Sequence, residues 1–311
     1  MNLTDIDSIL ASCRLCPRQC QANRLVSAGR CGGGRLPRIA LVSLHPWEEP
    51  VLTGTKGAGT VFFSGCSLGC VYCQNYEISH ENQGLEVSIQ RLGEIFWEQQ
   101  QRGAAVLDLV TPTHYVPQII QGLDLARQKG FSLPVVYNCS GYEKVETIEQ
   151  LSGYIDVFLP DLKYFSPELS AKYSMAGDYF QIASKAIKKM VEITGSPVLS
   201  DKGILTKGVL VRHMVLPGAR KDSMKLLKWL WQEFGDNIYL SLMSQYTPMY
   251  RAKESEFAPL GRRVTTFEYN SVVDYAAELG FTKCFMQERS AADAEYVPVW
   301  DGKNVLETNN L

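Results

Sequence analysis

Short apolar strands alternate with amphipathic helices along most of the chain, and this alternation constrains the fold more than any other feature. From residue 60, β-branched and aromatic runs such as TVFFSG, AVLDLVTP and PVVYNCS are each followed by a segment with helical periodicity. Residues 89–101, for example, place Ile89, Leu92, Ile95 and Phe96 on one face of a helix. Repeated strand–helix units predict parallel strands joined by right-handed helical crossovers.

Six such units predict an α/β fold, a partial (β/α)6 TIM-like barrel. We divide the sequence into a cysteine-rich amino-terminal appendage at residues 1–44, the barrel at residues 45–290 and a polar carboxy-terminal tail at residues 291–311. We expect the tail to be loose. The 311 residues suffice for one barrel with a small appendage. In such barrels the active site lies at the carboxyl ends of the strands.

Charge and composition argue against several classes of function. A net charge of −2 gives no global attraction for nucleic acid. No stretch approaches the roughly 18 apolar residues of a membrane span, and the first residues lack the basic and apolar parts of a signal peptide. Seven of the nine cysteines form two groups in the first quarter of the chain, which is typical of metal ligands in a reducing compartment. We therefore expect a cytoplasmic protein that binds neither nucleic acid nor membranes.

Three cysteines, Cys66, Cys70 and Cys73, follow the first predicted strand in the segment SGCSLGCVYCQN. Gly65 and Gly69 favour a loop over a helical cysteine stripe, because glycine weakens a helix by about 1 kcal/mol relative to alanine. A structural zinc ion needs four ligands, and no fourth ligand follows at the usual spacing. Three thiolates can instead hold a [4Fe-4S] cluster with one iron open to a substrate or cofactor.

The C-x3-C-x2-C spacing, with an aromatic Tyr72 before the last cysteine, resembles the signature of radical S-adenosylmethionine (SAM) enzymes. The segments GTKGAGTVFFSGCSLGCVYCQN, LVTPTHY, VYNCSGYE, DVFLPDLKY and VRHMVLPG resemble the subgroup related to pyruvate formate-lyase activating enzyme, over residues 45–290. An uncharacterised branch of this subgroup has similar amino-terminal cysteines. The resemblance implies an oxidoreductase that reductively cleaves SAM to a 5′-deoxyadenosyl radical, which then abstracts a hydrogen atom.

The resemblance also implies roles for residues at the strand ends. The open iron would bind the methionine part of SAM, and Tyr72 would lie near the adenine. Thr111 and Thr113 occupy the slot where many relatives hold the methionine ammonium, and hydroxyl and carbonyl groups can accept its hydrogen bonds. Asn138 matches a ribose-contact or cation position.

Three further residues complete this predicted cofactor site. Asp161 and Lys163 match an Asp-x-Lys motif, in which Lys163 would offer a charge to the methionine carboxylate. Arg212 lies in an apolar strand, where an unpaired charge would be costly, so it would reach a carboxylate of the cofactor or a structural acid. We favour the cofactor. The sequence predicts no catalytic residue.

A second group of thiols consists of Cys13, Cys16, Cys20 and Cys31. Four thiolates complete a coordination shell, so this group fits a structural zinc ion or a second, fully ligated iron–sulfur cluster. We favour iron–sulfur because the chain already requires cluster delivery. Six arginines lie between residues 14 and 38; they would offset the charge of such a centre, form a solvated face or bind an acidic partner.

The expected partners follow from this chemistry. An external one-electron donor of the flavodoxin or ferredoxin type would reduce the cluster, and a glycyl radical enzyme would supply the substrate glycine of an activase. Two alternatives stay open: a radical SAM enzyme acting on a small metabolite or peptide side chain, and a non-catalytic iron–sulfur carrier or scaffold. The polar residues at the strand ends favour an enzyme, because a carrier needs no such pocket.

Overall fold

The computed structural model of the protein describes residues 5–287 and 298–306. The strands in this part of the chain are β1 (Arg38–His45), β2 (Ala58–Phe63), β3 (Leu85–Glu86), β4 (Leu107–Val110), β5 (Val135–Cys139), β6 (Val157–Pro160), β7 (Val198–Leu199), β8 (Leu205–Met214), β9 (Tyr239–Met243) and β10 (Cys284–Met286). The α-helices are α1 (Ile6–Ala11), α2 (Pro50–Thr53), α3 (Tyr76–Ser79), α4 (Ile89–Gln101), α5 (Val116–Gln128), α6 (Val145–Glu149), α7 (Pro167–Ser174), α8 (Tyr179–Thr194), α9 (Arg220–Phe234) and α10 (Thr266–Leu279). Three 3-10 helices are η1 (Thr113–Tyr115), η2 (Gly235–Asn237) and η3 (Ser255–Phe257).

The strands form an open sheet in the order β10-β9-β8-β6-β5-β4-β2-β1-β3, with β7 paired to β8 outside this path. From β2 to β10 along this path the neighbouring strands are parallel, whereas β1 pairs with β2 in the antiparallel direction. The two end strands of the described sheet, β10 and β3, do not pair with each other, so the barrel stays partial. The predicted partial (β/α) barrel is therefore confirmed.

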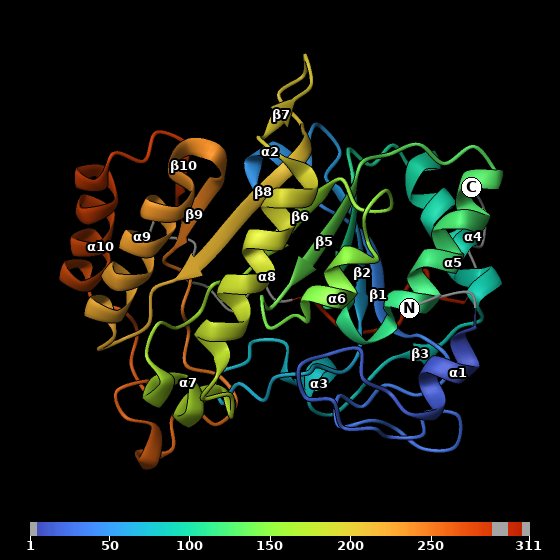
Figure 1. Ribbon diagram of the computed structural model, residues 1–311, viewed down its shortest axis with the longest axis horizontal. Coiled ribbons are helices and arrows are strands. Elements are labelled where there is room, and N and C mark those ends of the chain that lie inside the picture. The colour runs from blue at the N-terminus through green and yellow to red at the C-terminus, as the bar shows by residue number, and fades with distance from the viewer. Residues whose placement is uncertain (1–4, 288–297, 307–311) are drawn as a thin grey trace.

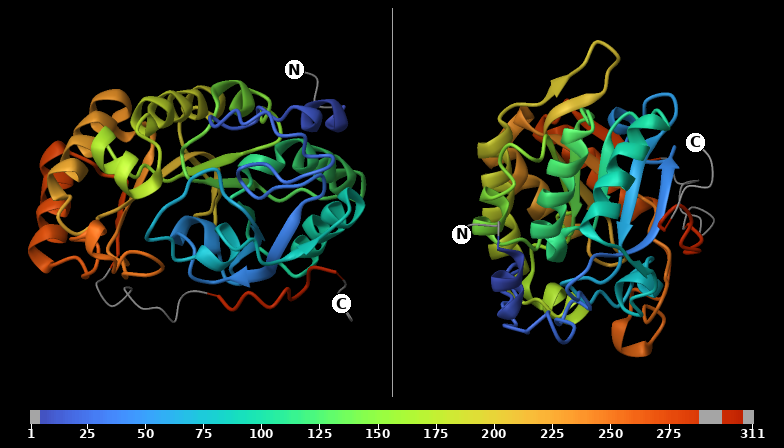
Figure 2. Two further views of the ribbon diagram at one scale, coloured as in Figure 1. Left: turned by 90° about the horizontal axis from the view of Figure 1, so that it is seen from below. Right: turned by 90° about the vertical axis from the view of Figure 1, so that its right-hand side faces the viewer.

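Six helical crossovers connect the parallel strands, through α4, α5, α6, α8, α9 and α10. These helices cover the outer face of the sheet (Figures 1 and 2). Helix α4 spans the predicted residues 89–101, because the Ser88 side chain accepts a hydrogen bond from the Arg91 amide and caps the amino end. Its apolar stripe, with Leu92, Ile95 and Phe96, is buried.

The amino-terminal segment lies beneath the carboxyl ends of the strands, where Figure 1 draws it in blue. Its first part is α1, and a small apolar cluster of Ile6, Ile9, Leu10, Cys13 and Leu15 packs there. The predicted boundary between residues 44 and 45 falls inside β1. Since β1 pairs with β2 along its length, these residues belong to the main sheet and the appendage ends before them.

The described part of the predicted tail, residues 298–306, packs against β1 and is not loose. The amide of Gly302 donates to the carbonyl of Ala40 at 3.1 Å, and the amide of Val42 donates to the carbonyl of Lys303 at 3.2 Å. Val305 is fully buried. These residues cover the outer edge of β1, which explains why the expectation of a loose tail is wrong here. Residues 291–297 and 307–311 of the predicted tail lie outside the described residues.

None of the helices in the described residues combines the length and apolar character that a membrane span requires.

Candidate active site

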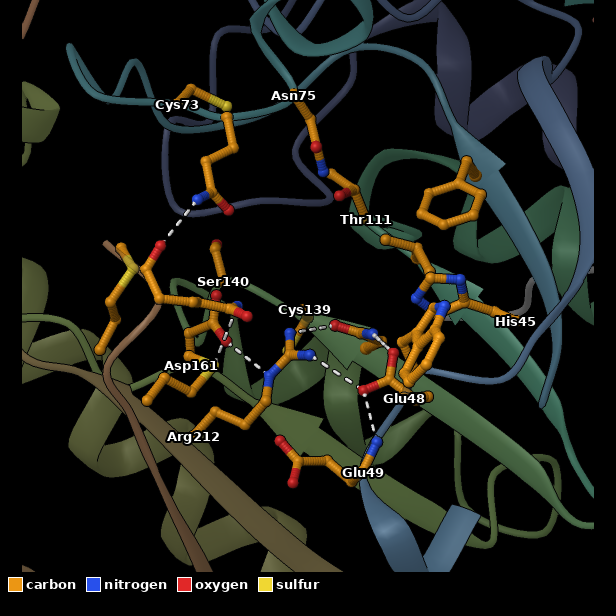
Figure 3. A pocket seen from close by; sticks show the side chains of 18 of the residues that line it. His45, Glu48, Glu49, Cys73, Asn75, Thr111, Cys139, Ser140, Asp161 and Arg212 are labelled. Carbon is orange, nitrogen blue, oxygen red and sulfur yellow. Dashed lines mark hydrogen bonds and ion pairs between the residues drawn. The ribbon is translucent and has the colours of Figure 1, made fainter. Parts of the chain in front are cut away.

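A cavity of about 780 Å³ lies between the cysteine loop and the carboxyl ends of the strands (Figure 3). Its volume is within the range of about 300–1,000 Å³ that is usual for ligand pockets. The predicted residues that line it are Cys66, Cys70, Cys73, Tyr72, Thr111, Asn138, Asp161, Lys163 and Arg212. The structure thus brings together the three-cysteine loop and all but one of the residues predicted to bind the cofactor.

Thr113 is the exception and does not line the cavity. After β4 the chain enters η1, in which the Thr113 hydroxyl donates a hydrogen bond to the Glu143 carboxyl at 2.6 Å. Thr111, which precedes this turn with a φ of 60°, faces the cavity instead. The sequence could not separate the two threonines, because the 3-10 turn that directs them apart leaves no clear periodic signal.

The thiols of the cysteine loop are half-buried and close enough to interact electrostatically. Burial raises the pKa of all three, and the neighbouring Cys70 further raises the pKa of Cys73, to about 11. Without a metal the thiols are therefore protonated at neutral pH, and metal binding must release protons. Gly65, at a φ of 88°, starts the loop; a Cβ at this position would collide with the carbonyl oxygen of Cys31.

A chain of buried hydroxyl groups ends on one of these thiols. The Tyr72 hydroxyl lies 2.6 Å from that of Tyr164, which lies 2.7 Å from the hydroxyl of Ser174. Ser174 donates to the sulfur of Cys70 at 2.9 Å. Tyr72 therefore lines the cavity with its ring, whereas its hydroxyl belongs to a hydrogen-bond chain that reaches a predicted cluster ligand.

The polar strand-end residues form one linked network (Figure 3). Arg212 donates to Asp161 at 2.9 Å and to Asn138 at 2.6 Å, and it pairs with Glu48 at 3.3 Å. Lys163 pairs with Asp161 at 2.7 Å. The sequence analysis considered two partners for Arg212, a carboxylate of the cofactor and a structural acid. In the structure its acidic partners are the structural acids Asp161 and Glu48.

Burial and the neighbouring charges shift the pKa values of this network in opposite directions. Burial alone would raise the pKa of Asp161, but Arg212 and Lys163 outweigh it and hold the pKa below its ordinary value. Burial alone would lower the pKa of Lys163, but Asp161 outweighs it and raises the pKa. Both groups therefore remain charged, and they present fixed charges to the cavity.

Comparison with known proteins identifies the family. The model of the radical SAM superfamily matches residues 60–230, which include the cysteine loop, the strand ends from β2 to β8 and most of α9. The chain belongs to the radical SAM superfamily. It is therefore an enzyme of that superfamily, and membership implies SAM and a [4Fe-4S] cluster as cofactors.

Individual relatives of this radical SAM enzyme are distant. An uncharacterized protein of Methanocaldococcus jannaschii is 26% identical over 279 residues, covering 86% of this chain and 75% of the relative. A radical SAM methyltransferase from Sphaerobacter thermophilus is 13% identical, with a TM-score of 0.51, covering 74% of this chain and 66% of that one. SuiB of Streptococcus suis, solved with SAM bound, is 13% identical with a TM-score of 0.45; the match covers 71% of this chain and 47%, about half, of SuiB.

The segment HPWEEP, residues 45–50, lines the cavity of this radical SAM enzyme and was missed by sequence reasoning. It connects β1 to α2, and Pro50 stands at the first turn of that helix. Figure 3 shows Glu48 and Glu49 on the side of the cavity opposite Cys73 and Asn75. The sequence signal that could have identified this segment is its pair of acidic residues between two prolines.

Glu49 is a buried carboxyl group whose pKa is raised to about 7, first by burial and then by repulsion from Glu48. Burial also raises the pKa of Asp108 well above its ordinary value. The raised pKa values favour the protonated forms of Glu49 and Asp108, which lowers the negative charge around Arg212.

We expect Glu49→Gln to remove a pH-dependent loss of stability. The unfolded glutamate has an ordinary pKa of 4.5 and the folded one about 7, so the folded state holds its proton more tightly. The stability from this proton is complete below about pH 4.5 and is lost as the pH rises through about 7, by up to roughly 3 kcal/mol. Urea unfolding should show that the variant gains stability relative to wild type between about pH 5 and about pH 8. The exposed Glu278→Gln is the control, and the same pH dependence in Glu49→Gln and wild type would contradict the assignment.

The amino-terminal cysteines lie apart from the cavity, behind the cysteine loop. Cys13, Cys16 and Cys31 are buried, and Cys20 is exposed. Burial is the main cause of the raised pKa of Cys16, about 11, and of the raised pKa of Cys31. The neighbouring thiols raise both pKa values further, so these groups interact electrostatically. Among the described residues, no group of three or more His, Cys, Asp or Glu side chains is arranged to hold a single metal ion.

Proposed function

We propose that Cys66, Cys70 and Cys73 hold the [4Fe-4S] cluster with one open iron, and that SAM binds beside it in the cavity. The support is that these thiols and the strand-end polar residues line the same cavity. When bound and reduced by one electron, the cluster supplies the reductive cleavage of SAM to methionine and a 5′-deoxyadenosyl radical.

The residues of the chain would bind and orient SAM. Lys163 and Arg212 would attract its methionine carboxylate, and both are already held in place by Asp161. Asn138 would form a hydrogen bond with the ribose, and Thr111 would accept a hydrogen bond from the methionine ammonium.

The proposed substrate is a glycine of a partner glycyl radical enzyme, which makes the protein an activase-like oxidoreductase. The support is the resemblance of the strand-end motifs to activating enzymes. A small metabolite is the second candidate, supported by the size of the cavity. We also propose a flavodoxin or ferredoxin as the electron donor and the cytoplasm as the location.

Release of 5′-deoxyadenosine tests this function directly. The anaerobic protein should cleave SAM with dithionite as reductant, and a glycyl radical enzyme should gain an organic radical signal in electron paramagnetic resonance (EPR) spectra. Rapid 5′-deoxyadenosine release that no glycyl radical enzyme changes would favour the metabolite. Absence of cleavage by protein that holds its full iron would reject SAM chemistry and favour the carrier alternative.

We expect Ser174→Ala to shift the reduction potential of the cluster to a more negative value. The variant loses the hydroxyl that donates to Cys70 at 2.9 Å, and hydrogen bonds to the sulfur ligands raise cluster potentials. EPR-monitored redox titration measures the shift. Ser170→Ala, in the same helix but bonded to the Pro167 carbonyl, is the control. An unshifted potential in Ser174→Ala would show that this hydroxyl does not tune the cluster.

We further propose that Cys13, Cys16, Cys20 and Cys31 hold a second metal centre, and we favour iron–sulfur over zinc because no three of these side chains are arranged around a single metal ion. Four thiols in one small segment and their mutual electrostatic interaction support a shared ligand.

A further inference from the structure

The two groups of cysteines are joined by a backbone hydrogen bond. The amide of Cys66 donates to the carbonyl of Cys31 at 3.0 Å. Arg18 adds a second connection, because its guanidinium donates to the carbonyl of Ser67 at 2.9 Å. Gly65 allows this approach, since any side chain there would collide with Cys31. The amino-terminal segment is thus fixed directly on the loop that carries Cys66.

This hydrogen bond makes a short route between two sulfur atoms. The route runs from the Cys31 sulfur through that residue to its carbonyl, across one hydrogen bond and through Cys66 to its sulfur. Standard bond lengths limit the distance between the sulfurs to roughly 12 Å. Electron transfer weakens steeply with distance, and it is faster along covalent and hydrogen bonds than across a gap. The contact is therefore suited to electron transfer.

Arg24 places a buried positive charge beside the amino-terminal thiols. Its side chain is 1% exposed, donates to the carbonyls of Gly33 at 3.0 Å, Gly34 at 2.8 Å and His114 at 2.5 Å, and approaches the Cys13 sulfur at 3.6 Å. Within the described residues, Arg24 forms no ion pair with a carboxylate. A buried cation is costly unless an anion offsets it. Thiolates on a metal centre would supply that anion.

We infer that the amino-terminal thiols hold an electron-transferring iron–sulfur centre that reduces the SAM-cleaving site through the Cys31–Cys66 contact. A reduced ferredoxin or flavodoxin would lose one electron to the outer centre near the exposed Cys20. The same electron would then pass from the Cys31 side to the Cys66 side, leaving the outer centre oxidised again. No bond breaks and no proton moves in this step. The inference rests on the proposed function, which requires a cluster at Cys66.

The metal content of a triple variant, Cys66→Ala with Cys70→Ala and Cys73→Ala, tests the outer centre by itself. We expect half the iron of wild type and an EPR signal that appears on reduction. Zinc in place of iron, or no reducible signal, would overturn the inference.

The transfer step is tested by reduction kinetics without SAM. In a Cys13→Ala, Cys16→Ala variant, dithionite should still reduce the remaining cluster, whereas reduced flavodoxin or ferredoxin should reduce it at least ten-fold more slowly than in wild type. Equal rates with the protein donor would overturn the relay. This readout does not depend on SAM cleavage.

Arg24→Gln provides a milder variant that keeps every cysteine. In the triple-alanine background, loss of this charge should shift the outer centre to a more negative potential, and Arg24→Lys should restore part of the shift. The exposed Arg14→Gln should leave the potential unchanged. An unshifted potential in Arg24→Gln would contradict an anionic centre beside Arg24.

The relay and the proposed function fail in different ways. Wild type that cleaves SAM with dithionite, together with a triple variant that holds only zinc, would reject the relay alone. Iron at the outer centre without SAM cleavage by wild type would reject the function alone.

Discussion

Replacement of Cys66, Cys70 and Cys73 with alanine should reduce SAM cleavage by at least about 10³-fold, to the background of the assay. The three thiols line the cavity that we assign to SAM, and the cluster that they would hold is the proposed source of the electron for its sulfonium group. Chromatographic measurement of 5′-deoxyadenosine under dithionite tests this result.

The matched control is Cys284→Ala. Cys284 lies half-buried in β10 and does not line the cavity, so this variant should cleave SAM at the wild-type rate within about two-fold. Substantial cleavage by the triple variant would mean that the cluster is held elsewhere, and our assignment of the loop would be wrong.

Replacement of Arg212 with methionine should destabilise the protein by about 3–5 kcal/mol. The guanidinium is the shared partner of Asp161 and Glu48, and the variant would leave Glu48 without a cationic partner and Asp161 with Lys163 alone. Urea unfolding at neutral pH measures the loss. The loss should be smaller in acid, because protonation removes the negative charges that Arg212 offsets in the wild type.

A surface arginine provides the comparison for this prediction. Arg251 pairs with Glu254 and Glu256, but its side chain is 43% exposed. Solvent screens such pairs, so Arg251→Met should destabilise the protein far less than Arg212→Met. Equal losses in the two variants would show that Arg212 does not stabilise the fold through its buried pairs.

The sequence predicted the barrel and the cysteine loop because both depend on local patterns. In the sequence, a fully buried parallel strand such as β5 is a short continuous run of mainly apolar residues that is followed by a helix. The spacing of Cys66, Cys70 and Cys73 is likewise local, and the order of the strands brings Asn138 and Asp161 to the same edge.

The remaining features depend on contacts between distant segments. Glu48 contacts Arg212, which lies 164 positions later in the sequence. The segment that carries Glu48 starts beside Ala58 at the beginning of β2, because β1 runs antiparallel to β2. Arg24 and Arg14 are alike in sequence, yet one is buried and the other exposed, because burial depends on where the appendage meets the loop. Pattern and spacing do not report such contacts.

The pairing of residues 302–304 with β1 has a consequence for synthesis on the ribosome. The side chain of Asn304 donates to the carbonyl of Val42, 262 positions earlier, at 2.8 Å. A nascent chain that has not yet reached residue 302 therefore leaves this side of β1 without its partner. Unpaired strand edges promote aggregation, so the nascent chain would expose an aggregation-prone edge of β1 until residues 302–304 have been synthesised, and chaperones are expected to matter most before that point.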